Sequence, residues 1–359
     1  MRPSLGRGDR VALLTSGGDA PGMNAALRGA ARVGASLGFQ MLGVEEGYVG
    51  LIQGRVRPLD LQSVDDAARR GGTVLGSARS KVFPTPEGQR LARETLVARG
   101  VRALLVIGGN GSLAGARALS DAVAVAGLPA SIDNDVACTS MSIGVDTALN
   151  TIVEACDRIA DTASAHRRTF FVEVMGRDCG YLAMTAAIAS GADAVLVPEA
   201  GRDEAAIVEG VARAMEAAYA RDSGKRRVLV VKAEGVKIDA ATLKERIDAR
   251  VARSLADVET RVTVLGHVVR GGSPTAFDRL LGARLANAAI RGLAAGESGF
   301  MAGWVGPGVT GAACAYDPYV VLTPLEEVLA ETTRLMRGES DIARWRRKIV
   351  QEIEPILAR

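Results

Sequence analysis

Short apolar runs alternate with longer alanine-rich or amphipathic stretches along most of this chain. Residues 11–15 (VALLT) and 101–107 (VRALLVI) are largely apolar runs of strand length, and each leads into a glycine-rich turn and a helical stretch. Runs of this kind, without strict alternation, are typical of strands that are buried on both faces. The pattern therefore predicts an α/β fold with a parallel sheet.

The same alternation continues through the second half of the chain. Strands are expected at residues 169–175, 194–197, 227–232 and 261–265, and helices at residues 24–37, 112–120, 142–163, 202–221, 241–256 and 278–293. Both halves are therefore predicted to be parallel α/β layers. The charged stretch 323–359 carries regularly spaced Leu and Ile and predicts one or two amphipathic helices.

Three glycine-rich segments fall within the first 120 residues: 16–24 (SGGDAPGMN), 71–79 (GGTVLGSAR) and 108–112 (GGNGS). A glycine turn between a strand and a helix directs backbone N–H groups at an anion. The first of these segments does not match the P-loop pattern, because no lysine stands at the required place. Loops that follow parallel strands converge at one edge of a sheet, so a phosphate-binding site of another kind is expected there.

An acidic segment follows the third glycine-rich loop, at residues 128–135 (LPASIDND). In an extended segment, side chains two residues apart point the same way, so Asp133 and Asp135 are expected to face one space beside Ser131. A helix cap or a solvated turn is the alternative, since Asp and Asn favour both.

Charged residues gather where the predicted strands end. They are Arg79, Asp133, Asp135, Arg168, Arg177, Glu234, Arg261, His267 and Arg270. Arginines hold phosphate through charge-assisted pairs, and a carboxylate such as Asp133 can act as a base on a hydroxyl. Together they predict phosphoryl transfer to a hydroxyl-bearing ligand, with solvated loop charges as the alternative. The two histidines, His166 and His267, both lie in these clusters, so at least one is expected to serve the site.

Composition narrows the classes of protein further. The chain has 359 residues, enough for two domains, and its net charge of +3 with 4% aromatic residues argues against nucleic-acid binding. No apolar run is long enough to span a membrane, and no signal-type stretch precedes the first strand. The four cysteines form no CxxC pair, so zinc ligation is not expected. A cytoplasmic α/β enzyme or binding protein is predicted.

Ordered motifs in the chain resemble those of the phosphofructokinase family. They are SGGDAPGMN (16–24), GGTVLGSAR (71–79), IGGNGS (107–112), SIDND (131–135), VEVMGRDCG (172–180) and TVLGHVVRGGSP (263–274), and the resemblance runs from about residue 11 to 293. It implies two similar Rossmann-like three-layer α/β domains with parallel-rich sheets and an active site in the cleft between them. It also implies a glycolytic kinase that transfers a phosphoryl group from ATP to the 1-hydroxyl of fructose 6-phosphate.

The resemblance assigns roles to individual residues of this chain. The sugar-phosphate site would be lined by Ser131, Asp133, Asp135, Met175, Gly176, Arg177, Glu234, His267 and Arg270, with Arg168 and Arg261 inserted from a neighbouring subunit. Asp133 would be the base, and Arg79 and Arg177 would stabilise the moving phosphoryl group. The donor site would include Gly18, Tyr48, Arg79, Ser80, Gly109, Asn110, Gly111 and Ser112. Arginines supplied by a neighbour imply a homotetramer, or a homodimer at minimum.

Two positions of the resemblance favour ATP as the donor. Gly111 stands where pyrophosphate users carry Asp, which would repel the α-phosphate of a nucleotide, and Ala130 stands where they carry Lys. Asn110 departs from the family, which has an acid there to help hold Mg²⁺; here Mg²⁺ would rest on Asn110 and Asp135. The alternatives are a pyrophosphate-dependent enzyme, a kinase of another ketose phosphate such as sedoheptulose 7-phosphate, or a non-catalytic sugar-phosphate-binding regulator.

The resemblance also predicts domain limits and regulation. The donor domain would comprise residues 1–144 and 269–320, and the sugar-phosphate domain residues 145–268 and 321–359. Of the arginines at the effector site of bacterial relatives, Arg28 and Arg32 are matched, but Leu61 and Ala160 replace two others. Weak or absent regulation by nucleoside diphosphates or phosphoenolpyruvate is therefore expected.

Overall fold

The structure is a computed structural model that describes residues 3–220, 224–306 and 314–357. The chain divides into two compact units. Unit 1 comprises Met1–Thr147 and Arg270–Thr333, and unit 2 comprises Ala148–Val269 and Arg334–Arg359. Each unit thus joins an early part of the chain to a later return.

Unit 1 is built on a seven-stranded sheet with the strand order β11-β10-β5-β4-β1-β2-β3. Its strands are β1 (Arg10–Ser16), β2 (Gln40–Val44), β3 (Val56–Pro58), β4 (Val101–Gly108), β5 (Ala124–Pro129), β10 (Phe300–Trp304) and β11 (Val320–Pro324). The five central strands are parallel, but the edge strands β3 and β11 pair antiparallel with their neighbours. The predicted parallel arrangement therefore describes the five central strands of this sheet, and the antiparallel pairing is confined to its two edges.

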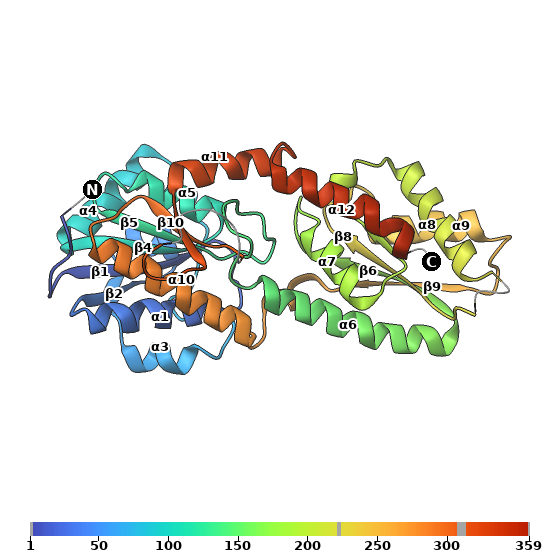
Figure 1. Ribbon diagram of the computed structural model, residues 1–359, viewed down its shortest axis with the longest axis horizontal. Coiled ribbons are helices and arrows are strands. Elements are labelled where there is room, and N and C mark those ends of the chain that lie inside the picture. Colours follow the sequence, from blue (N-terminus) through green and yellow to red (C-terminus); the bar gives the residue numbers. More distant parts are fainter. Residues whose placement is uncertain (1–2, 221–223, 307–313, 358–359) are drawn as a thin grey trace. The chain divides into compact units, whose positions relative to one another are not determined.

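Helices cover both faces of this sheet. They are α1 (Met23–Ser36), α2 (Gly47–Ile52), α3 (Leu61–Ala67), α4 (Pro86–Ala98), α5 (Asn110–Ala118) and α10 (Ala276–Ala294). Figure 1 shows α1, α3 and α10 on one side of the sheet and α4 and α5 on the other. Every residue of β4 except Arg102 is buried, as expected for a central strand between two helical layers.

Unit 2 contains a parallel four-stranded sheet with the order β7-β8-β6-β9. Its strands are β6 (Arg168–Val174), β7 (Ala194–Leu196), β8 (Val228–Ala233) and β9 (Glu259–Val264). The remaining elements of this unit are helices α6 (Val145–His166), α7 (Tyr181–Ser190), α8 (Glu204–Ala218), α9 (Ala240–Val251) and α12 (Asp341–Leu357), and the 3₁₀ segments η1 (Pro198–Ala200) and η2 (Gly266–Arg270). Helix α11 (Leu325–Met336) lies mostly in unit 1. The predicted end of one helix at residue 221 lies outside the described residues. The α/β class with parallel-rich sheets is confirmed.

The carboxyl-terminal stretch is shared between the units. Residues 321–333, expected in the second domain, belong to unit 1, because β11 pairs with β10 and both Leu325 and Val328 are fully buried in the core of unit 1. The predicted tail helices exist, but they begin only at Leu325, after β11. Among the described residues, no helix combines the length and apolar character needed to cross a membrane.

Candidate functional site

The carboxyl ends of three neighbouring strands bring the predicted phosphate loops together in unit 1. The register pairs Ser16 of β1 with Gly108 of β4, and Gly108 with Pro129 of β5. The next residue, Ala130, donates its backbone N–H to the carbonyl of Gly108 at 3.0 Å. The first and third glycine-rich loops and the acidic segment therefore begin side by side, as the sequence predicted.

The second glycine-rich loop is fastened to the same edge. Asn24 of α1 donates through Nδ2 to the carbonyls of Arg70 (3.0 Å) and Gly71 (3.3 Å), and its Oδ1 accepts from the backbone N–H of Val74 at 2.7 Å. The hydroxyl of Ser77 donates to the carbonyl of Gly17 at 2.5 Å. The sequence predicted no role for Asn24, the last residue of the SGGDAPGMN motif. The structure shows that its side chain holds the first and second glycine-rich loops together.

The acidic segment is a turn, so the prediction of an extended segment is wrong. Asn134 has a left-handed φ of 50°, and its backbone N–H approaches the carbonyl of Ser131 at 3.4 Å. Asn tolerates this conformation better than most residues. The turn brings the Ser131 hydroxyl to 2.9 Å from Oδ1 of Asp135, to which it donates. The side-chain Oδ1 of Asn134 accepts from the N–H of Ser142 at 3.0 Å and holds the chain beyond the turn.

Asp133 is buried, with 2% of its surface exposed. Its Oδ1 lies 3.9 Å from Nη2 of Arg270, and Nη1 of Arg270 donates to the carbonyl of Asp19 at 3.1 Å. A Cβ added at Gly18 would lie 2.8 Å from the same Nη1. Arg270 thus ties the candidate base to the first glycine-rich loop, and Gly18 leaves room for its guanidinium.

Asn110 and Asp135 lie close enough to hold a cation together. Nδ2 of Asn110 donates to Oδ2 of Asp135 at 3.0 Å. Oδ1 of Asn110 is buried and has no hydrogen-bond partner among the described residues. An orphaned amide oxygen beside a carboxylate fits the oxygen ligands that Mg²⁺ prefers, with phosphates and water completing the shell. The described part of the chain contains no group of three or more His, Cys, Asp or Glu side chains that could hold a metal alone.

The other predicted donor residues include Tyr48 and Gly111 at α5 and Arg79 and Ser80 at the end of the second glycine-rich loop. Tyr48 is buried, its hydroxyl donates to the carbonyl of Ser112 at 2.7 Å, and burial raises the pKa of its phenol. Tyr48 therefore holds the first turn of α5 in place. A Cβ added at Gly111 would meet no described atom within 4 Å. Arg79 is exposed, and the hydroxyl of Ser80 accepts from the N–H of Phe83 at 2.9 Å.

In unit 2, the ends of β6 and β8 form a second group of predicted residues. Oε1 of Glu234 accepts from the backbone N–H groups of Gly176 (3.2 Å) and Arg177 (2.8 Å). Met175 and Gly176 are buried, whereas Arg177 and Glu234 are exposed. His267 is exposed in η2, immediately after β9. Each of these residues follows the carboxyl end of its strand, as predicted.

Three residues expected at that edge lie at the other end of the unit 2 sheet. Arg168 begins β6 and pairs with Glu259, the first residue of β9, to which Arg261 also binds. Hydrogen bonding from Arg168 lowers the pKa of Glu259. His166 is the exposed last residue of α6, just before β6. Since β6 is seven residues long, the two edges are ~20 Å apart at about 3.3 Å per residue.

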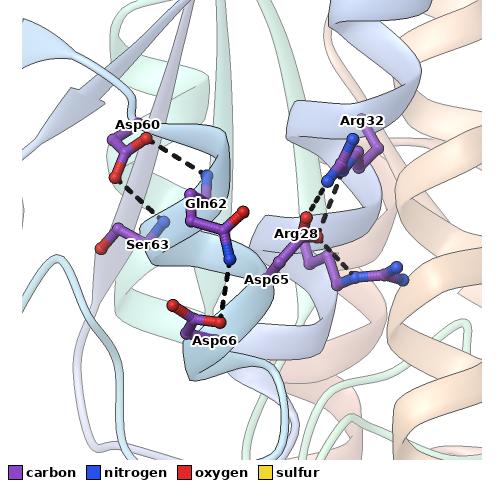
Figure 2. A network of polar contacts seen from close by, with 7 residues as sticks. All are labelled: Arg28, Arg32, Asp60, Gln62, Ser63, Asp65 and Asp66. Atoms are coloured by element: carbon purple, nitrogen blue, oxygen red, sulfur yellow. Dashed lines mark hydrogen bonds and ion pairs between the residues drawn. The ribbon is translucent and has the colours of Figure 1, made fainter.

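Two arginines of α1, Arg28 and Arg32, face Asp65 of α3 (Figure 2). Asp65 accepts from Nε of Arg28 at 2.8 Å and from Nε of Arg32 at 3.2 Å. One carboxylate of this chain therefore binds both arginines that resemble effector-site residues. Leu61, which replaces another of those arginines, begins α3.

Comparison with known proteins agrees with these motifs. The phosphofructokinase family profile matches residues 10–293. The ATP-dependent 6-phosphofructokinase of Natranaerobius thermophilus is 47% identical over 295 residues, which cover 82% of this chain and 89% of that protein. The ATP-dependent 6-phosphofructokinase 1 of Thermus thermophilus is 45% identical over 332 residues, 92% of this chain and 96% of that protein. Phosphofructokinase from Saccharomyces cerevisiae superposes with a TM-score of 0.81 at 31% identity over 97% of this chain, which spans 48% of the yeast chain.

Proposed function

Because the chain belongs to the phosphofructokinase family, we propose that it transfers the γ-phosphoryl group of ATP to the 1-hydroxyl of fructose 6-phosphate. The observation that carries the proposal is the buried Asp133 beside Arg270, at the edge where three glycine-rich loops meet. The loops offer backbone N–H groups to the phosphates of a nucleotide, and Asp133 supplies the base for the acceptor hydroxyl.

Each remaining group has a role in the same reaction. Arg79 and Arg177 neutralise charge on the phosphoryl group as it moves. Mg²⁺, held by Asn110 and Asp135, supplies Lewis-acid stabilisation of the phosphates when bound. Glu234 orients the backbone at Arg177 and accepts a hydrogen bond from a sugar hydroxyl, while Met175, Gly176 and His267 line the sugar-phosphate-binding part of unit 2.

The positions of Arg168 and Arg261 support a homo-oligomeric enzyme, at minimum a homodimer. Arg168 begins β6, and Arg261 pairs with Phe170, the third residue of the same strand. At about 3.3 Å per residue, the backbones of the two arginines lie ~23 and ~16 Å along the sheet from the level of Met175, so they serve Met175 and Glu234 poorly within one subunit. We propose that both arginines serve the sugar phosphate of a neighbouring subunit in a cytoplasmic homotetramer.

The test measures fructose 1,6-bisphosphate formation from fructose 6-phosphate and Mg²⁺, with ATP and with pyrophosphate in parallel. Turnover with ATP is expected. Asp133→Ala removes the base and is expected to lower kcat by about 10²–10⁴-fold while fructose 6-phosphate still raises the melting temperature. Turnover with pyrophosphate alone would refute the assignment of ATP as the donor. Binding of fructose 6-phosphate without turnover in the wild type would indicate a non-catalytic sugar-phosphate-binding regulator. An Asp133→Ala variant with unchanged kcat would refute the role of Asp133.

A further inference from the structure

The carboxyl-terminal helix α12 carries one buried arginine. Arg346 is 6% exposed, whereas Arg344, Arg347 and Lys348 on the same helix are exposed. An amphipathic helix normally buries its apolar stripe and keeps its charges in water. A guanidinium in the buried stripe therefore requires a specific environment.

That environment is the segment after β6. Nη1 of Arg346 donates to Sγ of Cys179 at 2.9 Å, across 167 residues of sequence. Its guanidinium carbon also lies 4.9 Å from the ring centroid of Tyr181, the first residue of α7, within the range of a cation–π contact. Arg346 thus connects the last helix of the chain to the loop that carries Arg177.

We call residues 176–180 the acceptor loop. Its backbone is unusual: Arg177 has a left-handed φ of 50°, and Gly176 has a φ of 146°. A positive φ at a residue other than glycine costs free energy and persists only where the surroundings impose it. The loop is closed by the N–H of Cys179, which donates to the carbonyl of Gly176 at 2.9 Å.

Side chains from three different elements hold the acceptor loop. Glu234 accepts from its first two N–H groups. Glu199 of η1 accepts from the N–H of Gly180 at 2.8 and 3.0 Å. Arg346 is the third, and it contacts the loop at Cys179. The other end of α12 is fixed by an ion pair between Glu354 and Arg202, so the helix that carries Arg346 is itself anchored.

We propose that Arg346 is a positioning residue for fructose 6-phosphate binding, acting through Cys179 on Met175, Gly176 and Arg177. The inference rests on the proposed function, which assigns these three residues to the sugar phosphate. It gives the carboxyl-terminal helix a role in the reaction, although Arg346 itself need not touch the substrate.

The test compares Arg346→Met, Arg346→Lys and Lys348→Met with the wild type. Arg346→Met is expected to raise the KM for fructose 6-phosphate about tenfold, equivalent to about 1.4 kcal/mol. The KM for ATP should stay within about twofold, because the donor loops lie in unit 1. The kcat should fall together with the loss of sugar-phosphate binding, because the acceptor loop also carries Arg177. Arg346→Lys keeps a cationic donor and should recover part of the loss. Lys348→Met removes an exposed charge from the same helix and should change none of these values.

Cys179→Ala tests the contact from the loop side, and it decides the question if Arg346→Met fails to fold. An unchanged KM for fructose 6-phosphate in either variant overturns the inference, as does an equal rise in both KM values, which would indicate general loss of structure. The rise in melting temperature with fructose 6-phosphate alone is measured for every variant. A wild type that binds the sugar phosphate without turnover refutes the proposed kinase, and the positioning role is then judged from this binding. A wild type that neither binds fructose 6-phosphate nor turns it over refutes both the proposed kinase and the positioning role of Arg346.

Discussion

Gly111 is the second residue of α5, and nothing in the described part of the chain occupies the space of a Cβ there. Gly111→Asp should therefore stabilise the fold by about 1 kcal/mol, because glycine disfavours a helix and an acid in the first turn favours it. The same carboxylate should repel the nucleotide and lower kcat/KM for ATP at least about tenfold. Denaturant unfolding and ATP kinetics measure the two effects.

The control for this change is Gly111→Ala, which adds a Cβ without charge. It should stabilise the fold by about half as much as Gly111→Asp and keep most of the activity with ATP. If Gly111→Ala lost as much activity as Gly111→Asp, bulk rather than charge would exclude the nucleotide, and the electrostatic explanation would be wrong.

Asn110 offers a second test at the residue scale. Asn110→Asp replaces the donor to Asp135 with a second carboxylate at hydrogen-bonding distance. Without Mg²⁺, the like charges should lower the melting temperature, since such a pair disfavours ionisation of both acids. With Mg²⁺, the added charge should strengthen cation binding about tenfold, or about 1.4 kcal/mol.

A titration of melting temperature against Mg²⁺ separates these two effects of Asn110→Asp, with Ca²⁺ as a comparison cation. The wild type should show the smaller response. An equal response in both proteins would mean that Asn110 does not face the cation, and Asp135 alone would remain as the ligand.

Single residues also mark where sequence reasoning failed. The segment 131–135 has the residue types of a site, but the prediction of an extended backbone missed the left-handed Asn134. Asp and Asn serve turns and sites equally well, so the spacing of two carboxylates could not distinguish the geometries. The contact between Arg346 and Cys179 had no sequence signal, because one arginine in a charged helix resembles its exposed neighbours.

At the scale of elements, Asp278 joins the start of α10 to the start of α6. It is fully buried, and its carboxylate accepts from the N–H groups of Gly144 and Thr147, both at 2.8 Å, and from the Thr147 hydroxyl at 2.6 Å. Asp278→Asn keeps the shape but leaves one oxygen for three donors. The free energy of unfolding should fall by about 1–3 kcal/mol, as measured by denaturant titration.

The cost of Asp278→Asn should also depend on pH. Burial raises the pKa of Asp278, opposed by hydrogen bonds from Thr147 and Gly144. The folded state therefore holds this proton more tightly than the unfolded state, so the contribution of Asp278 is greatest below its ordinary pKa of 3.8 and declines as pH rises through the folded value. An amide does not titrate, so the difference between the two proteins should shrink from acid to neutral pH.

The elements were predicted where hydrophobic periodicity was strong. The runs that became β1, β4, β6 and β8 are largely apolar segments, and buried parallel strands have this pattern. The edge strands β3 and β11 were not predicted, and neither were the inner strands β2, β5 and β10, because a strand of three to six residues leaves little periodicity in the sequence. Strand direction also depends on pairing partners, which a linear pattern does not contain.

At the scale of the whole molecule, the limits of the two units follow from which strands pair with each other and not from the local composition of the sequence. The chain passes between the units at three points, which fall inside α6, η2 and α11. A helix that continues through a division shows no glycine, proline or polar break there. The sequence therefore indicated two α/β units but could not show that residues 321–333 return to the first.

A mixing experiment tests the proposed sharing of residues between subunits. Arg168→Ala and Asp133→Ala should each be nearly inactive alone. Subunits that are unfolded together and refolded in equal amounts should regain about a quarter of wild-type activity, since half of random pairs are hybrids with one complete site of two. Arg168→Ala mixed with the double variant Arg168→Ala/Asp133→Ala should regain none. Absence of recovery in the first mixture would place Arg168 outside the neighbour's site.

The open space beside Gly111 bears on how this family diversifies. A glycine codon becomes an aspartate codon by one base change, and here the new side chain would meet no described atom of the protein itself. Most changes at an active site must pass through a less stable protein, but this one should not. The expected loss of ATP as donor would therefore require no prior stabilising mutation, and donor preference would then be a poor record of ancestry.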